Sequence, residues 1–263
     1  MPIVFAAITP HPPILIASIG KGKENKIPKT IDALSKLEQD LYISKPDVLV
    51  ILSPHNQIFE KVFSLNLCEK FSSNYEKFGD FSTEENWIGE MILPYIVKEK
   101  SIEKNLTVQL ITEKKLDHGT TIPLHMLTKN LSNIKILPIG ESKLSPKEQL
   151  NFGKLLYEVF SESEKRIAII ASTELSQALN SDSPAGFHKA GQEFDGKIIE
   201  LLQNHNTAGI AQIDSEIVEK SSQCGYNSLL ILLGCLKNIN YNFKNLSYET
   251  TLGIGYLTGE FVF

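Results

Sequence analysis

The feature that most constrains the fold is a series of short, continuous apolar runs that alternate with longer stretches of helical periodicity. The strongest runs lie at residues 4–9, 48–52 and 167–171, and they contain few polar positions. A strand has this composition when both of its faces are covered, which is typical of parallel sheets flanked by helices. The pattern therefore predicts an α/β protein with a central sheet.

The same alternation continues along all 263 residues. Helices are expected at residues 27–43, 84–98, 123–131, 146–160, 191–203, 215–220 and 228–236, and further strands at residues 64–67, 108–111 and 134–139. Two adjacent strand-like stretches, residues 241–249 and 253–263, predict an antiparallel edge. No shift in composition marks a boundary. We therefore expect a single domain over residues 1–263, with a mixed, mostly parallel sheet and helices on both faces.

Charge and cysteine content narrow the function classes. The net charge is −5 and Arg166 is the only arginine, so we expect neither nucleic acid nor a membrane surface as a partner. The three cysteines are too few and too scattered for a disulfide framework, which favours reduced thiols and a cytoplasmic location. The first residues lack the basic segment of a signal peptide, and the longest apolar run is too short to span a bilayer.

Two histidines and a carboxylate follow the three strongest predicted strands. His11 comes after residues 4–9, His55 after residues 48–52, and Glu174 after residues 167–171. In open α/β sheets, ligands bind at the carboxyl ends of the strands. Two imidazoles with an anionic third group form a site for a divalent metal with open positions. A single histidine after a strand is more often a polar loop residue, so these positions alone leave both interpretations open.

A series of short motifs extends from the first predicted strand to the last. They are Ile8-Thr9-Pro10-His11-Pro12-Pro13, the run at residues 46–55, Leu116-Asp117-His118-Gly119-Thr120, Glu174-Leu175-Ser176-Gln177, Pro184-Ala185-Gly186-Phe187, Cys224-Gly225-Tyr226 and Gly253-Ile254-Gly255-Tyr256-Leu257. In this order, the set resembles the LigB-like superfamily of class III extradiol dioxygenase B subunits. That superfamily includes the Memo-like proteins, also called AmmeMemoRadiSam system protein B. The resemblance implies a LigB-like domain with a non-haem Fe(II) site.

The resemblance also implies the metal ligands. His11 and His55 match the two histidine ligands of the family. Cys224 stands where ring-cleaving members have a glutamate and where Memo-like members have a cysteine. A thiolate is a softer ligand than a carboxylate, so copper and zinc are alternatives to Fe(II). The other interpretation of Cys224 is a buried core cysteine.

The catalytic positions depart from the family pattern. The histidine that serves ring-cleaving members as acid and base is replaced by Gln177, and Glu174 stands in place of an aspartate. Glutamine can hydrogen-bond an oxygen but cannot exchange a proton near neutral pH. His118 matches a position that lines the family's pocket, where it would act as acid and base or as a substrate hydrogen-bonding group. We take His118, Gln177 and Glu174 as the candidate catalytic residues.

These observations favour an enzyme: O₂-dependent, Fe(II)-dependent ring cleavage of a small catechol-type aromatic substrate. The alternative is a Memo-like metal-binding protein without ring cleavage and with a redox or partner-binding role, which Cys224 and Gln177 favour. Metal-dependent hydrolysis is a third interpretation, since an open metal site can activate water. On family grounds we also expect a homo-oligomer, and an accessory small subunit stays open.

Overall fold

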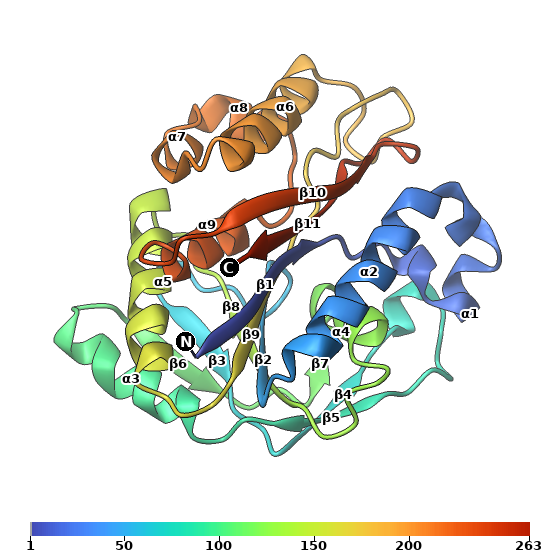
Figure 1. Cartoon of the computed structure of the whole chain (residues 1–263). Helices are drawn as coiled ribbons and strands as arrows, with labels where there is room; N and C mark the ends of the chain where they lie inside the picture. Colours follow the sequence, from blue (N-terminus) through green and yellow to red (C-terminus); the bar gives the residue numbers. More distant parts are fainter. Residues whose placement is uncertain (1) are drawn as a thin grey trace.

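A mixed β-sheet runs through the middle of the protein (Figure 1). The computed structural model describes residues 2–263, and eleven strands within this range form the sheet. Its centre consists of four mutually parallel strands, in the order β1 (Ile3–Thr9), β9 (Ile167–Ser172), β2 (Val48–Ser53) and β8 (Lys135–Gly140). The carboxyl ends of these four strands therefore lie at the same edge of the sheet.

The outer strands make the sheet mixed. On one side, β11 (Tyr256–Val262) pairs antiparallel with β1 and with the edge strand β10 (Asn242–Glu249), which confirms the expected antiparallel pair. The other side is built from the short strands β3 (Phe63–Asn66), β4 (Lys70–Ser73), β5 (Asn86–Gly89), β6 (Val108–Ile111) and β7 (Lys115–Leu116). The prediction of a single α/β domain with a mixed, mostly parallel sheet is confirmed.

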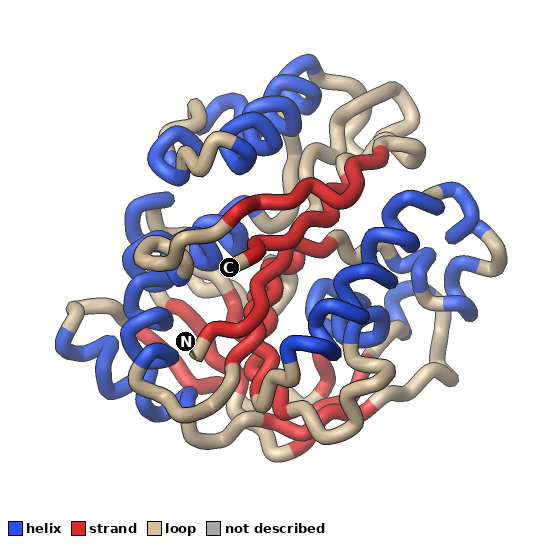
Figure 2. Tube along the Cα trace, in the orientation of Figure 1, coloured by secondary structure: helices blue, strands red, loops and turns tan. Residues whose placement is uncertain are grey.

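Helices cover both faces of the sheet, as Figures 1 and 2 show. One face packs against α2 (Pro28–Ser44) and α4 (His118–Leu127). The other face packs against α9 (Tyr226–Cys235), α5 (Pro146–Ser161) and α3 (Leu93–Glu103), which follow one another across the sheet. A further group lies beside β10 and consists of α6 (Lys189–Gln203), α7 (Thr207–Ala211) and α8 (Ser215–Lys220). The remaining elements are short: η1 (Pro13–Leu15), α1 (Ala17–Gly20), η2 (Lys23–Lys26) and η3 (Glu76–Phe78).

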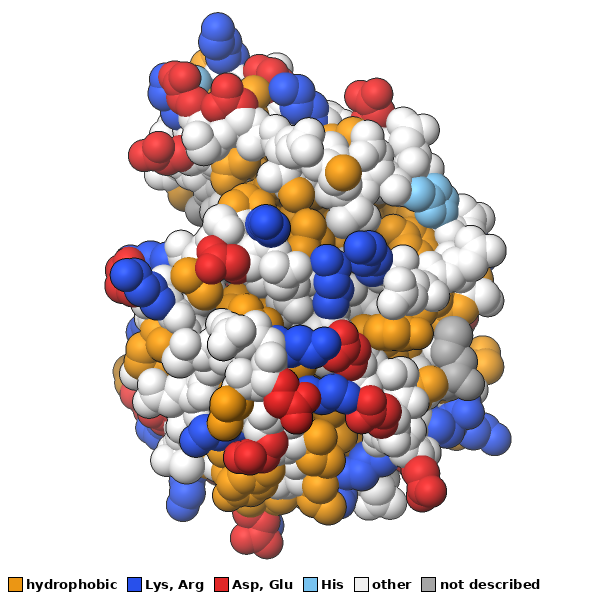
Figure 3. Space-filling model, turned by 90° about the vertical axis from the view of Figure 1, so that its left-hand side faces the viewer, with side chains coloured by type: hydrophobic (Ala, Val, Ile, Leu, Met, Phe, Trp, Pro, Cys, Tyr) orange, Lys and Arg blue, Asp and Glu red, His pale blue; other side chains and the backbone are white. Residues whose placement is uncertain are grey.

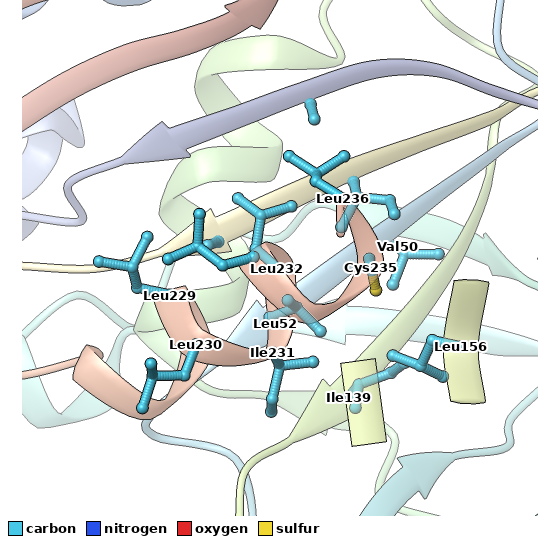
Figure 4. Close-up of a cluster of buried hydrophobic side chains, with 14 of the residues drawn as sticks. Val50, Leu52, Ile139, Leu156, Leu229, Leu230, Ile231, Leu232, Cys235 and Leu236 are labelled. Carbon is cyan, nitrogen blue, oxygen red and sulfur yellow. The ribbon is translucent and has the colours of Figure 1, made fainter. Parts of the chain in front are cut away.

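The apolar composition of β2 follows from its position between two hydrophobic layers. Val50 and Leu52 belong to the cluster beneath α5 and α9, whereas Leu49 and Ile51 belong to the cluster beneath α2 and α4. Successive side chains of a strand point to opposite faces, so every position of β2 is buried. Figure 4 shows Val50 and Leu52 together with the leucines of α9, a helix that is apolar almost all round.

The predicted helix at residues 84–98 is wrong in its first half. Residues 86–89 form β5, which pairs with β4 and β8 and alternates between exposed and buried side chains. The helix α3 begins at Leu93, with Pro94 in its first turn, where the missing N–H of proline costs nothing. The predicted helix at residues 123–131 is shifted as well, because Asp117 accepts a hydrogen bond from Thr120 N at 2.9 Å and caps α4 at His118.

The surface carries mixed charge. On the face in Figure 3, Lys and Arg side chains are interspersed with Asp and Glu side chains and with small apolar patches. Two ion pairs connect α3 to α5. Lys100 of α3 pairs with Glu162, the C-cap of α5, and Lys104, the C-cap of α3, pairs with Glu158 of α5. None of the helices within residues 2–263 combines the length and the apolar character that a membrane-spanning helix needs.

We expect Gly153→Ala to destabilise the fold, because α5 and α9 approach each other closely at this glycine. A Cβ atom at Gly153 would lie 2.1 Å from the carbonyl oxygen of Ile231, so the two helices must separate. Overpacking of this kind costs about 1–3 kcal/mol of unfolding free energy, measured by urea denaturation. The matched control is Gly196→Ala on α6, where a Cβ meets nothing within 4 Å and helix propensity alone predicts a gain of about 0.8–1 kcal/mol. Equal stability changes in the two variants would contradict the close contact.

Candidate metal centre

His11 and His55 meet at the carboxyl edge of the sheet. They follow β1 and β2, the strands on either side of β9, and each histidine comes directly after a proline. Their Nε2 atoms lie 3.1 Å apart. The His11 side chain is buried, whereas His55 is exposed towards a cavity. The parallel register of the central strands thus brings together two imidazoles from distant parts of the chain.

Cys224 reaches the same point from the segment before α9. Its Sγ atom lies 3.0 Å from Nε2 of His55 and 3.5 Å from Nε2 of His11. Two backbone hydrogen bonds with Glu174, of 2.6 and 3.0 Å, hold this segment beside the end of β9. Gly225 then turns the chain into α9 with a φ of +108°, and a Cβ there would lie 2.7 Å from Cα of Thr173. Glycine is therefore required after Cys224 by both the backbone conformation and the close approach.

Ser172 fixes the orientation and the tautomer of His11. The Ser172 hydroxyl donates its proton to the carbonyl oxygen of Gly119 at 2.5 Å. Its oxygen can therefore only accept from Nδ1 of His11, which lies 2.8 Å away. The proton of the neutral imidazole is thus on Nδ1, and the Nε2 lone pair points at His55 and Cys224. Such a partner on the second ring nitrogen is the usual support of a metal-binding histidine.

The protonation states suit metal binding. Burial, followed by the neighbouring His55 and His118, lowers the pKa of His11 well below its ordinary value. Burial also lowers the pKa of His55, and burial together with His55 lowers the pKa of His118 to about 4. These imidazoles are therefore neutral near pH 7 and have free lone pairs. Burial, and then the carboxylate of Glu174, raises the pKa of Cys224, so its proton leaves only when a cation compensates the thiolate.

The spacing of the donor atoms fits one first-row ion. Nitrogen and sulfur ligands at about 2.0–2.3 Å from such an ion lie roughly 3–3.5 Å from one another. The three distances among His11, His55 and Cys224 are 3.1, 3.0 and 3.5 Å. His118 adds a third imidazole, since the ligand atoms of the three histidines lie within 4.8 Å of one another. The donor set suits iron, copper or zinc.

We expect Ser172→Ala to weaken metal binding by about 10–100-fold, because the variant removes the acceptor that holds Nδ1–H of His11. The dissociation constant is measured by competition with a chelator. Ser247→Ala is the control, since Ser247 is also buried and its hydroxyl has no hydrogen-bond partner within residues 2–263. An affinity that changes no more in Ser172→Ala than in Ser247→Ala would refute this role.

Glu174 and Gln177 lie beside the three donors. The Glu174 carboxyl is buried, which raises its pKa to about 7, and its Oε2 accepts a hydrogen bond from Nε2 of Gln177 at 3.3 Å. The loop that carries both residues is fixed by Asp195, which accepts from Ser176 N and from the Tyr248 hydroxyl, each at 2.7 Å. The amide of Gln177 is therefore directed at Glu174.

The structure adds residues that the sequence did not indicate. A cavity of about 260 Å³ adjoins His55 and His118, and Lys77 and Phe78 also line it. The Phe78 ring lies edge-on to the His118 ring, with 5.1 Å between their centroids. Lys77 and Phe78 are the last residues of the short helix η3 after β4, and no motif marks them. Asp117, in contrast, belongs to the sequence motif that contains His118. Its Oδ1 accepts a hydrogen bond from the Ser53 hydroxyl at 2.7 Å.

Comparison with known proteins identifies the family. The sequence profile of the family described as "Catalytic LigB subunit of aromatic ring-opening dioxygenase" matches residues 5–259. The chain belongs to the LigB family. The resemblance seen in the motifs is thus confirmed, and the dioxygenase-like fold follows from it. Members of the LigB family are typically metal-dependent, and the group of His11, His55 and His118 could hold a metal ion.

Two curated proteins and one solved structure are similar to this LigB-family chain. Protein CA_C1420 of Clostridium acetobutylicum is 30% identical over 95% of this chain and 55% of its own length. A MEMO1 family protein of Methanosarcina mazei is 26% identical over 48% of this chain and 44% of its own length. The chain therefore spans about half the length of the curated relatives it matches. The crystal structure of the uncharacterized protein JW3007 from Escherichia coli K12 has the same fold, with a TM-score of 0.68, 14% identity, and coverage of 98% of this chain and 99% of that one.

Proposed function

We propose that this LigB-family protein is a metal-dependent dioxygenase that opens the ring of a catechol-type substrate with O₂. The observation that carries the proposal is the convergence of two neutral imidazoles and a thiol beside a cavity, at 3.0–3.5 Å from one another. Fe(II) is the proposed metal, and copper and zinc are the alternatives. The ligands would be His11, His55 and Cys224, with Cys224 as the anionic member.

The protein's own residues have distinct roles in this proposal. When bound, Fe(II) would supply open positions for the substrate hydroxyls and O₂ and a route for electron density between them. Ser172 keeps the proton of His11 on the nitrogen that faces away from the centre. His118 lines the cavity and would hydrogen-bond a substrate oxygen. Glu174 and Gln177 would border the open positions from the opposite side.

A second candidate function is supported by one residue, Gln177. Its amide donates to Glu174 and cannot exchange a proton near neutral pH, so the centre lacks the acid and base of the ring-cleaving members. A Memo-like protein would bind the metal without ring cleavage and would have a redox or partner-binding role.

The test is an oxygen-electrode assay of the Fe(II)-loaded protein with a panel of catechols. We expect O₂ consumption with an equal amount of ring-opened product, and loss of both in His55→Ala. Stoichiometric metal without product from any catechol would reject ring cleavage and favour the Memo-like alternative. Ester and amide substrates in the same assay series test the hydrolytic interpretation, for which we expect no turnover.

A further inference from the structure

The helix α4 contains a proline in its interior. Pro123 is the sixth of the ten residues of this helix, and it is buried. A proline at such a position lacks the N–H that would bond the carbonyl oxygen four residues earlier, and its ring displaces that carbonyl. In α4 this carbonyl belongs to Gly119. Proline is the least favourable residue inside a helix, so the contacts of Gly119 decide whether Pro123 has a role at the site.

The Gly119 carbonyl has its hydrogen-bond donor outside the helix. The hydroxyl of Ser172, the last residue of β9, donates to it at 2.5 Å. The serine oxygen lies 2.8 Å from Nδ1 of His11, and both side chains are buried. Because Pro123 has no N–H, no helical donor from position 123 competes with the serine for this carbonyl. The hydroxyl proton is therefore directed to Gly119, and the serine oxygen accepts from His11.

Gly119 also adjoins the second histidine of the centre. A Cβ atom at Gly119 would lie 2.9 Å from Cδ2 of His55 and 2.8 Å from Oγ of Ser53. The backbone of α4 thus approaches the His55 ring at the same residue whose carbonyl reaches Ser172. A side-chain cap at Asp117 fixes the start of the helix, which lies against one face of the sheet (Figure 1). The first turn of α4 is therefore in contact with the supports of both histidines.

We propose that Pro123 is a positioning residue of the metal centre. Because it lacks an N–H, it leaves the Gly119 carbonyl as an acceptor for Ser172 and thereby keeps the proton of His11 on Nδ1. An N–H at position 123 would share this carbonyl, and the serine hydroxyl could then donate to Nδ1 instead. The imidazole proton would move to Nε2, the nitrogen that faces His55 and Cys224. This inference rests on the proposed function, since it takes His11 as a metal ligand, and it adds a residue that touches none of the donors.

The first test is the tautomer of His11 in the metal-free protein, read from the NMR chemical shifts of its two ring nitrogens and assigned with His11→Gln. We expect Nδ1–H in the unsubstituted protein and a larger share of Nε2–H in Pro123→Ala. An Nε2–H tautomer must lose its proton before it can bind a metal, so the affinity for Co(II) should fall about three- to tenfold, the effect of one hydrogen bond.

Pro94→Ala is the matched control. Pro94 is also buried, but it lies in the first turn of α3, where the missing N–H leaves no helical hydrogen bond unmade. We expect this variant to keep both the tautomer of His11 and the Co(II) affinity. The double variant Pro123→Ala/Ser172→Ala should bind Co(II) no more weakly than Ser172→Ala alone, because Pro123 acts through the serine.

The outcomes separate the role of Pro123 from the proposed function. An Nε2–H tautomer in the unsubstituted protein, or an unchanged tautomer in Pro123→Ala, would overturn the inference and leave the metal centre standing. Losses of affinity that multiply in the double variant would also overturn it, since Pro123 would then act independently of Ser172. A tautomer that depends on Pro123 in a protein that binds no Co(II) would support the link from Pro123 to His11 and reject the proposed function.

Discussion

Gln177→His is expected to increase ring cleavage by about 10²–10⁴-fold, because it restores a group that can exchange a proton beside the metal centre. The side chain at this position already reaches Glu174, whose carboxyl would orient an imidazole as it now orients the amide. The unperturbed pKa of histidine is about 6.5, close to the working pH of a general acid and base. The gain is measured as the rate of O₂ consumption with a catechol at saturating metal.

The control for this variant is Gln177→Asn, which keeps an amide at the position and adds no titratable group. We expect no gain in Gln177→Asn. Activity that rises equally in both variants would show that the size of the side chain at position 177, and not proton transfer, limits the reaction. A fully metal-loaded Gln177→His protein that stays inactive with every catechol would contradict the dioxygenase proposal itself.

Cys224→Ala is expected to weaken metal binding by more than about 100-fold, beyond the range for loss of a supporting residue. The variant removes the anionic member of the three donors and leaves two neutral imidazoles. The affinity is measured by chelator competition under anaerobic conditions. Cys68→Ala is the matched control, because Cys68 is a buried thiol in the core cluster beneath α2 and α4.

The position of His118 supplies the competing explanation for this result. Its ligand atom lies within 4.8 Å of those of His11 and His55, so His118 could complete a three-histidine site without the thiol. In that case Cys224→Ala would leave the affinity unchanged and His118→Ala would lower it. The direct contacts of the Cys224 sulfur with the two imidazole nitrogens, at 3.0 and 3.5 Å, lead us to expect the opposite order.

Local sequence patterns were sufficient to predict the fold class and the edge of the sheet at which the site lies. Continuous apolar runs such as β2 predicted a sheet covered on both faces, and His11 and His55 were expected at its carboxyl edge. The prediction for residues 84–98 was wrong in its first half because only residues 90–92 separate the short strand β5 from the first turn of α3. Residues 86–89 form a strand because they pair with β4 and β8. These are contacts between separate segments of the chain, which local sequence patterns do not reveal.

The details of the site depended on contacts between distant residues. Ser172 is the last residue of β9, yet its role comes from Gly119 and His11, which lie far away along the chain. Lys77 and Phe78 reach the cavity from the short helix η3, which no sequence motif marks. The roles of His118, Gln177 and Glu174 in catalysis stay predictions, as does the homo-oligomeric state.

The most direct test of the centre is a cobalt titration of the metal-free protein, followed by absorption spectroscopy. We expect binding of one Co(II) per chain with a thiolate-to-metal charge-transfer band, and loss of this band in Cys224→Ser but not in Cys68→Ala. The expectation follows from the 3.0 and 3.5 Å distances between the Cys224 sulfur and the two imidazoles. Absence of stoichiometric binding, or a band that persists in Cys224→Ser, would contradict a metal centre formed by His11, His55 and Cys224.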